Sequence, residues 1–184
     1  MARTASTPRE SWIGEGLREL ATGGPEAVRI EPLAKSLGVS KGSFYWHFTD
    51  RGALLDALLD AWERTYVDDA IAQVEADGGD GRTRLRDLFG LAEASSAELL
   101  PLDLAIREWA RRDVRVMARL TRVDNRRMDF LRLLFSDFAR DAGDVEARSL
   151  LVFSVWVGQP LIAAEHGSRS RRDAVRAALD FVLR

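Results

Sequence analysis

The stretch that most constrains the fold of this chain runs from Gly38 to Leu55 and has the sequence GVSKGSFYWHFTDRGALL. It opens with glycine and serine, and then brings lysine, hydroxyl, aromatic, histidine and arginine side chains close together. Glycine tolerates the left-handed backbone of a tight turn, and a serine side chain accepts hydrogen bonds from the first amides of a helix. The stretch therefore predicts a turn at Gly38, a cap at Ser40 and a short helix from Lys41 to Phe48.

The residues before this turn predict another short helix. Leu33, Ala34 and Leu37 follow helical spacing and supply an apolar face. Phe44 and Phe48 of the following helix are expected to pack against this face. Two short helices joined by a tight turn form a helix-turn-helix.

The same residues relate the chain to a known family. The pattern resembles the DNA-binding domain of the TetR family of transcriptional repressors at Leu33-Ala34, Leu37-Gly38-Val39-Ser40, Gly42-Ser43-Phe44-Tyr45-Trp46-His47-Phe48, Arg51 and Leu54-Leu55. This resemblance is confined to the N-terminal part of the chain. It implies an all-α fold in which a three-helix head is joined by a long helix to a helical-bundle regulatory body. It also implies a homodimer that binds double-stranded operator DNA and responds to a small-molecule effector.

The start of a recognition helix faces base edges in the major groove, so small or polar side chains are expected there. Ser40, Lys41, Gly42 and Ser43 meet this requirement. Gly42 permits close approach of the backbone, and Lys41 can donate to a guanine. Helix capping alone is the alternative explanation for Ser40 and Ser43.

By resemblance, further residues are expected to contact the DNA backbone. Tyr45 and His47 would contact phosphates through the phenol hydroxyl and the imidazole, and Trp46 would lie against sugar and phosphate. Arg51 stands where the family usually has lysine, and its guanidinium would hold a phosphate together with the amides of the next helix. The alternatives are that Trp46 supports the helix from the protein side and that His47 is a surface histidine capping a carbonyl.

Helical periodicity extends through the rest of the chain, without strand-like alternation longer than a few residues. A helix beginning at Thr7-Pro8 is expected to end at Gly23-Gly24-Pro25, and a long helix capped by Thr49 is expected to end near Ala76. After a glycine-rich break, further helices are expected over 82–98, from Pro101, over 113–140, over 145–166 and from about 170 to 184.

We expect a helix-turn-helix DNA-binding domain at residues 1–51 and a ligand-sensing and dimerisation domain at residues 52–184. Within the latter, Leu150–Val157 is apolar on every side, so it lies either at the centre of the domain or at an interface with a second chain. By resemblance, the last two long helices pair with their copies in a partner. That surface would be completed by Ala164, Val175, Ala178, Leu179 and Val182.

Composition limits the classes of protein and partner. No apolar run reaches the roughly 18 residues of a membrane span, and Met1–Thr7 lacks the apolar segment of a signal peptide, so we expect a cytoplasmic protein. With no cysteine and two histidines, neither a metal nor a cofactor is expected. Residues 1–51 hold seven cationic and six acidic side chains, so the case for DNA rests on where the cations lie.

A small-molecule pocket is expected between the two long central helices and the helix beginning at Pro101. Its candidate lining is Phe89, Asp103, Leu104, Glu108, Trp109, Met117, Leu120, Asp124, Met128 and Trp156. These side chains favour a largely apolar or aromatic effector. The alternative is that they form an ordinary helical core.

The sequence thus predicts a transcriptional regulator, most simply a repressor that binds a near-palindromic operator as a dimer and is released by an effector. No nucleophile motif, glycine-rich phosphate loop or paired histidine arrangement is present, so an enzyme is not expected. A DNA-binding architectural protein without an effector is the main alternative, and a helical-bundle enzyme is a more distant one.

Overall fold

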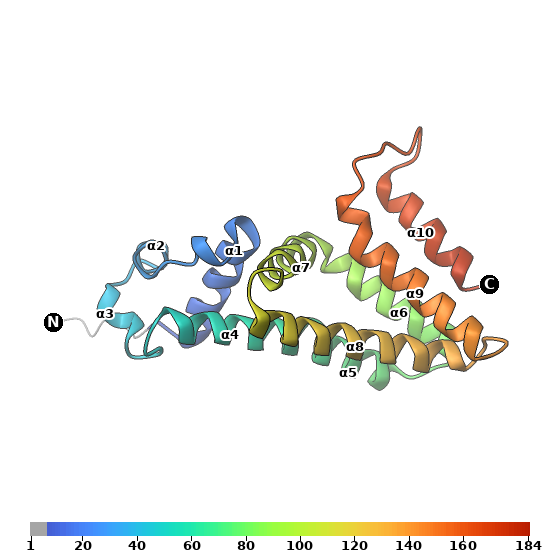
Figure 1. The fold of residues 1–184 in the computed structure, drawn as a ribbon, viewed down its shortest axis with the longest axis horizontal. Helices are drawn as coiled ribbons and strands as arrows, with labels where there is room; N and C mark the ends of the chain where they lie inside the picture. Colours follow the sequence, from blue (N-terminus) through green and yellow to red (C-terminus); the bar gives the residue numbers. More distant parts are fainter. Residues whose placement is uncertain (1–6) are drawn as a thin grey trace. The chain divides into compact units, whose positions relative to one another are not determined.

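The computed structural model describes residues 7–184, and every regular element in that range is a helix. The order is α1 (Arg9–Ala27), α2 (Ile30–Ser36), α3 (Lys41–Phe44), α4 (Arg51–Glu63), the π-type turn η1 (Arg64–Asp68), α5 (Asp69–Asp77), α6 (Gly81–Ala94), α7 (Ser96–Ala110), α8 (Val114–Ser136), α9 (Ala142–Gly158), the 3-10 turn η2 (Gln159–Leu161) and α10 (Arg171–Val182) (Figure 1). The all-α prediction is confirmed.

Residues 1–6 lie outside the described range, so the expectation about a signal peptide, which concerns Met1–Thr7, is not addressed by the fold. Among the helices of residues 7–184, none combines the length and the apolar character that crossing a bilayer requires.

The chain forms two compact units. The first contains residues 7–70 and 94–123, and the second contains residues 71–93 and 124–184. The boundary between the units therefore falls within α8 and two residues after the start of α5. The predicted domain boundary after residue 51 stays a prediction, and α4 belongs to the same compact unit as the helix-turn-helix.

The head is built on an apolar core between α1, α2, α3 and α4. Trp12 of α1 is fully buried and meets the Phe44 ring edge to face, with centroids 5.3 Å apart. Leu33 of α2 is also fully buried. Gly16 lets α1 approach α4 closely, because a Cβ at this position would lie 2.8 Å from the Leu58 side chain. α1 also contacts α7, which belongs to the same unit.

The ends of α1 differ in detail from the prediction. The expected Thr7 cap is wrong by one residue, because Pro8 occupies the N-cap position and its carbonyl accepts a hydrogen bond from the Ser11 amide at 3.1 Å. The backbone leaves helical geometry at Gly24, where φ is 69°, which confirms the predicted break. One further turn follows, because Pro25 has the backbone angle that a first helical turn needs.

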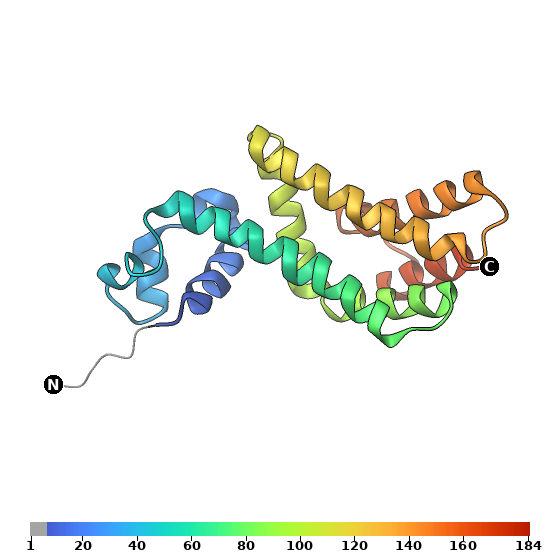
Figure 2. The ribbon, with the colours of Figure 1, turned by 90° about the horizontal axis from the view of Figure 1, so that it is seen from below.

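The long helix after the recognition segment begins at a different cap from the one predicted. Asp50 occupies the N-cap position instead of Thr49, and its carboxylate accepts a hydrogen bond from the Ala53 amide at 2.8 Å. Aspartate is a stronger cap than threonine. Helical turns continue from α4 through η1, so the long helix is present with one wider turn at Arg64–Asp68 (Figure 2).

α7 and α9 also depart from the expected limits. α7 begins at Ser96, so Pro101 lies inside the helix and removes one backbone hydrogen bond from it. α9 ends at Gly158, and the predicted continuation to His166 is wrong, because Pro160 follows in the tighter turn η2.

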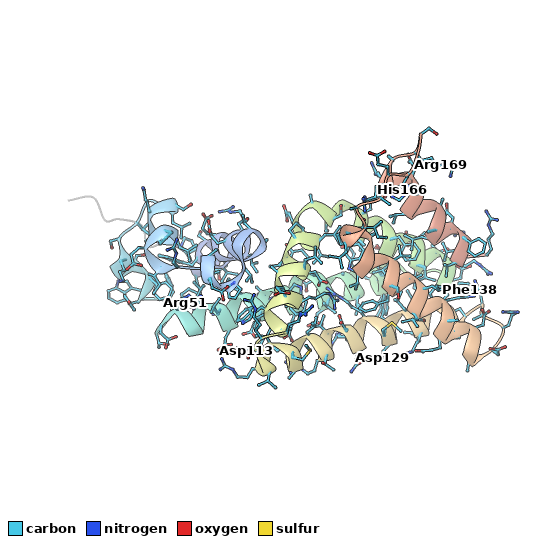
Figure 3. The ribbon with its side chains drawn as sticks, turned by 45° about the horizontal axis from the view of Figure 1, so that its top comes forward. Arg51, Asp113, Asp129, Phe138, His166 and Arg169 are labelled. Atoms are coloured by element: carbon cyan, nitrogen blue, oxygen red, sulfur yellow. The ribbon has the colours of Figure 1, made fainter. Side chains whose placement is uncertain are left out.

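The core of the second unit draws on α5, α6, α8, α9 and α10. Its buried members are Val74, Leu85, Met128, Phe130, Leu131, Leu134, Phe135, Val152, Val182 and Leu183. α6 starts in close contact with α8, since a Cβ at Gly81 would lie 2.1 Å from the Leu134 carbonyl oxygen. At the same end of α6, the Arg82 guanidinium lies 4.0 Å from the centroid of the Phe138 ring, which is labelled in Figure 3.

The apolar segment of α9 is only partly covered by its own unit. Val152 is buried in the core, whereas Leu150 and Leu151 each remain 54% exposed. A place at the centre of the body is therefore excluded for these two leucines, and an interface with a second chain remains as the expected explanation. Val182 of α10 is buried in the core, so its predicted place on that interface is wrong.

Candidate nucleic-acid interface

The turn of the helix-turn-helix is closed by two backbone hydrogen bonds. Gly38 has φ 68°, the left-handed conformation predicted for it. The Val39 amide donates to the Ala34 carbonyl at 2.9 Å, and the Gly38 amide donates to the Lys35 carbonyl at 3.1 Å. This pair of bonds is a Schellman motif, which ends α2 and sets the direction of the next segment. The predicted turn is confirmed.

α3 is shorter than predicted. Ser40 occupies its N-cap position, and the backbone carbonyl of Ser40 accepts a hydrogen bond from the Ser43 amide at 3.0 Å. The cap is therefore made by the backbone and not by the serine hydroxyl. At the other end, the amides of His47 and Phe48 both donate to the Phe44 carbonyl, so the helix ends at Phe44 and a turn leads to Phe48.

Two phenylalanines anchor this segment to the head. Phe44 is fully buried, Phe48 is almost so, and their rings stack with centroids 5.3 Å apart. Their predicted inward direction is confirmed. Between them, Tyr45 is 54% exposed and Trp46 is 85% exposed. The alternative that Trp46 supports the helix from the protein side is wrong, because its ring faces solvent.

The start of α3 presents small and polar groups to solvent. Ser40, Lys41 and Gly42 are exposed, and Ser43 is half-buried. A Cβ at Gly42 would be in ordinary contact with the Ser40 hydroxyl, at 3.6 Å, so packing within the protein does not require glycine there. The lack of a side chain at this position leaves room for another molecule to approach the backbone.

Lys41 forms an ion pair that the sequence did not predict. Its Nζ lies 2.5 Å from Oε1 of Glu31 in α2. This hydrogen bond lowers the pKa of Glu31 and raises the pKa of Lys41, so both groups are charged at neutral pH. No helical spacing rule links residues 31 and 41, which are brought together by the turn at Gly38.

His47 and Arg51 are both engaged within the head. Nε2 of His47 donates to the Thr7 carbonyl at 2.7 Å, which is the carbonyl-capping alternative considered for this residue. Arg51, labelled in Figure 3, donates from Nε to the Val28 carbonyl at 2.6 Å and from Nη2 to the Pro25 carbonyl. These bonds tie both ends of α1 to the segment around α3 and α4. The phosphate contacts expected for the two residues stay predictions.

Part of the predicted effector site belongs to the first unit, on α7 and α8: Asp103, Leu104, Glu108, Trp109, Met117 and Leu120. Asp103 is buried and forms an ion pair with Arg107 at 2.9 Å, so its carboxylate has a partner in its own helix. Glu108 and Met117 are exposed, Leu104 and Trp109 are half-buried, and Leu120 is buried.

The other candidate effector residues belong to the second unit: Phe89, Asp124, Met128 and Trp156. Met128 is a member of the buried core and Phe89 packs against it, as the core alternative predicts for both. Asp124 and Trp156 are half-buried. The predicted lining is thus divided between the two compact units, and its role as a ligand site stays a prediction.

A helix-turn-helix whose second helix carries exposed polar and aromatic side chains, followed by helices alone up to residue 184, is typical of helical DNA-binding regulators. Residues 13–58 match the family described as bacterial regulatory proteins, tetR family. A stretch of 53 residues is 43% identical to the tetracycline repressor protein class C of Escherichia coli, and this match covers 29% of the chain and 24% of the repressor. The N-terminal part of the chain is thus similar to TetR-family regulators, as its motif predicted.

Solved structures share the fold over almost the whole chain. A TetR transcriptional regulator from Legionella pneumophila has a TM-score of 0.79 at 13% identity, with 99% of this chain and all of that chain (100%) covered. A transcriptional regulator from Rhodococcus has a TM-score of 0.72 at 21% identity, covering 96% and 94%. A ketosteroid transcriptional regulator of Mycobacterium tuberculosis has a TM-score of 0.68 at 17% identity, covering 98% and 97%.

Proposed function

We propose that this protein is a transcriptional repressor that binds double-stranded operator DNA through α3 and the turn after it. The observation that carries the proposal is the combination of buried Phe44 and Phe48 with exposed Lys41, Tyr45 and Trp46. The phenylalanines hold the segment on the head, while the exposed groups are accessible to a ligand. An ammonium group donates to guanine, and phenol and indole groups donate to phosphate.

The residues of the segment take different roles in this proposal. The start of the helix, Ser40–Ser43, faces base edges, and Tyr45 and Trp46 contact the sugar-phosphate backbone. His47 and Arg51 keep the segment in place through their bonds to backbone carbonyls, and any phosphate contact comes in addition to those bonds. Contacts to phosphate position the protein, while contacts to base edges supply sequence preference.

We further propose that the active form is a homodimer joined through α9 and α10. Large apolar side chains are exposed on this part of the second unit: Leu150, Leu151, Leu161, Ile162 and Phe181. A group of exposed apolar side chains is a common mark of a subunit interface, since burying them removes apolar surface from water. A two-fold dimer presents two heads, and its operator is therefore a near-palindrome.

The release of DNA by an effector completes the proposal. Within the first unit, α7 contacts α1 of the head, and α7 carries Leu104 and Trp109 among the candidate effector residues. A small, largely apolar or aromatic compound that binds α7 differently in two arrangements of the head would shift the equilibrium between them. We expect this regulator to act in the cytoplasm, where its DNA lies.

Selection of duplex fragments from random DNA, with the full-length protein at low ionic strength, tests the repressor proposal. A near-palindrome with half-sites about 34 Å apart, or a small multiple of this distance, is the expected outcome. Compounds that release the selected duplex then identify the effector class, and steroids are a reasonable first group because one structural relative is named a ketosteroid regulator. A monomeric protein that retains no duplex would overturn the proposal.

A further inference from the structure

The lysine proposed to read bases already has a partner in the free protein. Nζ of Lys41 lies 2.5 Å from Oε1 of Glu31, and the two side chains are 51% and 66% exposed. Glu31 lies in the first turn of α2, and Lys41 is the first residue of α3. The ion pair is therefore accessible to any molecule that approaches the start of the recognition helix.

An ion pair this exposed is weak enough for DNA to displace it, because water screens both charges. A phosphate or a guanine edge offers Lys41 another acceptor, and release of counterions from DNA favours the exchange. As long as the pair is intact, however, its net charge is zero. Lys41 then adds nothing to the attraction between the head and DNA.

The carboxylate has a second cation nearby when Lys41 leaves. Arg29, at the N-cap position of α2, interacts electrostatically with Glu31 and favours its charged form. Glu31 therefore still has a positive charge nearby after Lys41 has moved to DNA.

We propose that Glu31 competes with DNA for Lys41 and thereby sets the affinity of the recognition helix for duplex DNA. The inference rests on the proposed DNA-binding function. Binding requires Lys41 to leave the carboxylate and to donate to a base edge or a phosphate instead. Glu31 is thus a positioning residue that holds the lysine of the free protein in a neutral pair.

A double-mutant cycle with Glu31→Gln, Lys41→Gln and the double variant tests this proposal in the full-length protein. Fluorescence anisotropy measures the affinity for the selected operator and for a random duplex over a series of salt concentrations. Glu31→Gln should tighten binding about two- to fivefold near 0.1 M salt, the range that loss of an exposed pair allows. The slope of log affinity against log salt should be the same for Glu31→Gln as for the wild type, because Lys41 contacts DNA in both complexes, and should become shallower by about 0.9 for Lys41→Gln.

In the Lys41→Gln background, the change at Glu31 should alter affinity by less than about twofold, because the competing pair is already absent. Glu26→Gln is the matched control, since Glu26 is an exposed glutamate of α1. Thermal unfolding of each variant shows whether the head remains folded.

The outcomes separate this inference from the function on which it rests. If the wild-type protein binds duplex DNA and Glu31→Gln leaves its affinity unchanged, the competition is overturned while the repressor proposal stands. An equal gain in both lysine backgrounds, or in Glu26→Gln, also overturns it, because a general change of charge then explains the effect. If the wild-type protein binds no duplex, both proposals fall.

Discussion

At the scale of the residue, Arg51 has hydrogen-bond partners within the head that the sequence did not predict. Its position at the start of α4 suggested a phosphate contact, yet Nε and Nη2 donate to the carbonyls of Val28 and Pro25. Pro25 lies in the last turn of α1 and Val28 is its C-cap residue, at the junction with α2, where carbonyls lack the amides of a following helical turn as donors. Arg51 therefore joins this junction to α4.

We predict that Arg51→Ala destabilises the head by about 1–3 kcal/mol, because two partly buried carbonyls lose a charged donor. Denaturant unfolding followed by tryptophan fluorescence measures the change, since Trp12 lies in the head core. Arg29→Ala is the control, because Arg29 is exposed in the same head. Unfolding midpoints that are equal for wild type and Arg51→Ala would refute the internal role.

Asp144 near the start of α9 allows a prediction on pH at the same scale. Hydrogen bonds from Arg140, and then from Arg148, hold the pKa of this carboxyl well below its ordinary value. A carboxyl with a lowered folded pKa stabilises the protein fully above its unfolded pKa, about 4, and this contribution is lost as pH falls further.

Asp144→Asn should therefore be less stable than the wild type at neutral pH, by an amount that is constant above about pH 5 and shrinks below about pH 4. Thermal unfolding of both proteins between pH 3 and pH 7 is the measurement. A stability difference that stays constant over the whole range would contradict the prediction.

At the scale of the element, α6 and α8 approach each other through a glycine. A Cβ on Gly81 would lie 2.1 Å from the Leu134 carbonyl oxygen and 2.9 Å from Cβ of Asp137, so the first turn of α6 has no room for a side chain. The neighbouring ion pair between Arg84 and Asp137, at 2.9 Å, joins the same two helices. The close contact between α6 and α8 thus requires a residue without a Cβ at position 81.

We predict that Gly81→Ala destabilises the second unit by about 1–3 kcal/mol, the usual cost of adding a methyl group to a packed contact. Gly90→Ala in the same helix is the matched control, because Gly90 is exposed and a Cβ there has open space. That substitution should be stabilising by up to about 1 kcal/mol through helix propensity. Denaturant unfolding should show a lower free energy of unfolding for Gly81→Ala and a higher one for Gly90→Ala. Changes of the same sign in both variants would argue against the close contact.

At the scale of the whole molecule, the exposed apolar side chains of α9 and α10 are the basis of the proposed homodimer. Leu150, Leu151 and Phe181 are exposed although the core of their unit is filled by other residues of the same helices. The cost of leaving such side chains in water is relieved when a second copy covers them. In the proposed dimer, two heads would bind an operator together, whereas a single head would bind half of it.

Leu151→Asp should therefore shift the protein towards a monomer and weaken operator binding by more than about tenfold, because two-point attachment is lost. Sedimentation velocity reports the oligomeric state, and anisotropy reports the affinity. Leu133→Asp in α8 is the control, since Leu133 is 50% exposed but lies on neither α9 nor α10. A Leu151→Asp protein that remains a dimer would exclude this leucine from the interface.

Local features of this protein could be predicted from the sequence, because they depend on neighbours a few residues apart. The left-handed turn at Gly38, the inward direction of Phe44 and Phe48, and the helical character of residues 7–184 all follow from local sterics and the 3.6-residue period. The recognition segment could be named for the same reason, since its residues are contiguous. Helix ends were predicted less well, as at Pro160, because several nearby residues compete to stop a helix.

Contacts between residues far apart in the chain were decided only by the tertiary structure. Arg51 has similar local preferences whether it faces a phosphate or the Val28 carbonyl, and the sequence carries no signal that joins Glu31 to Lys41. The partial exposure of Leu151 within an apolar run is likewise set by which neighbours reach it. A side chain's chemistry is local, whereas its partner depends on how the whole chain packs.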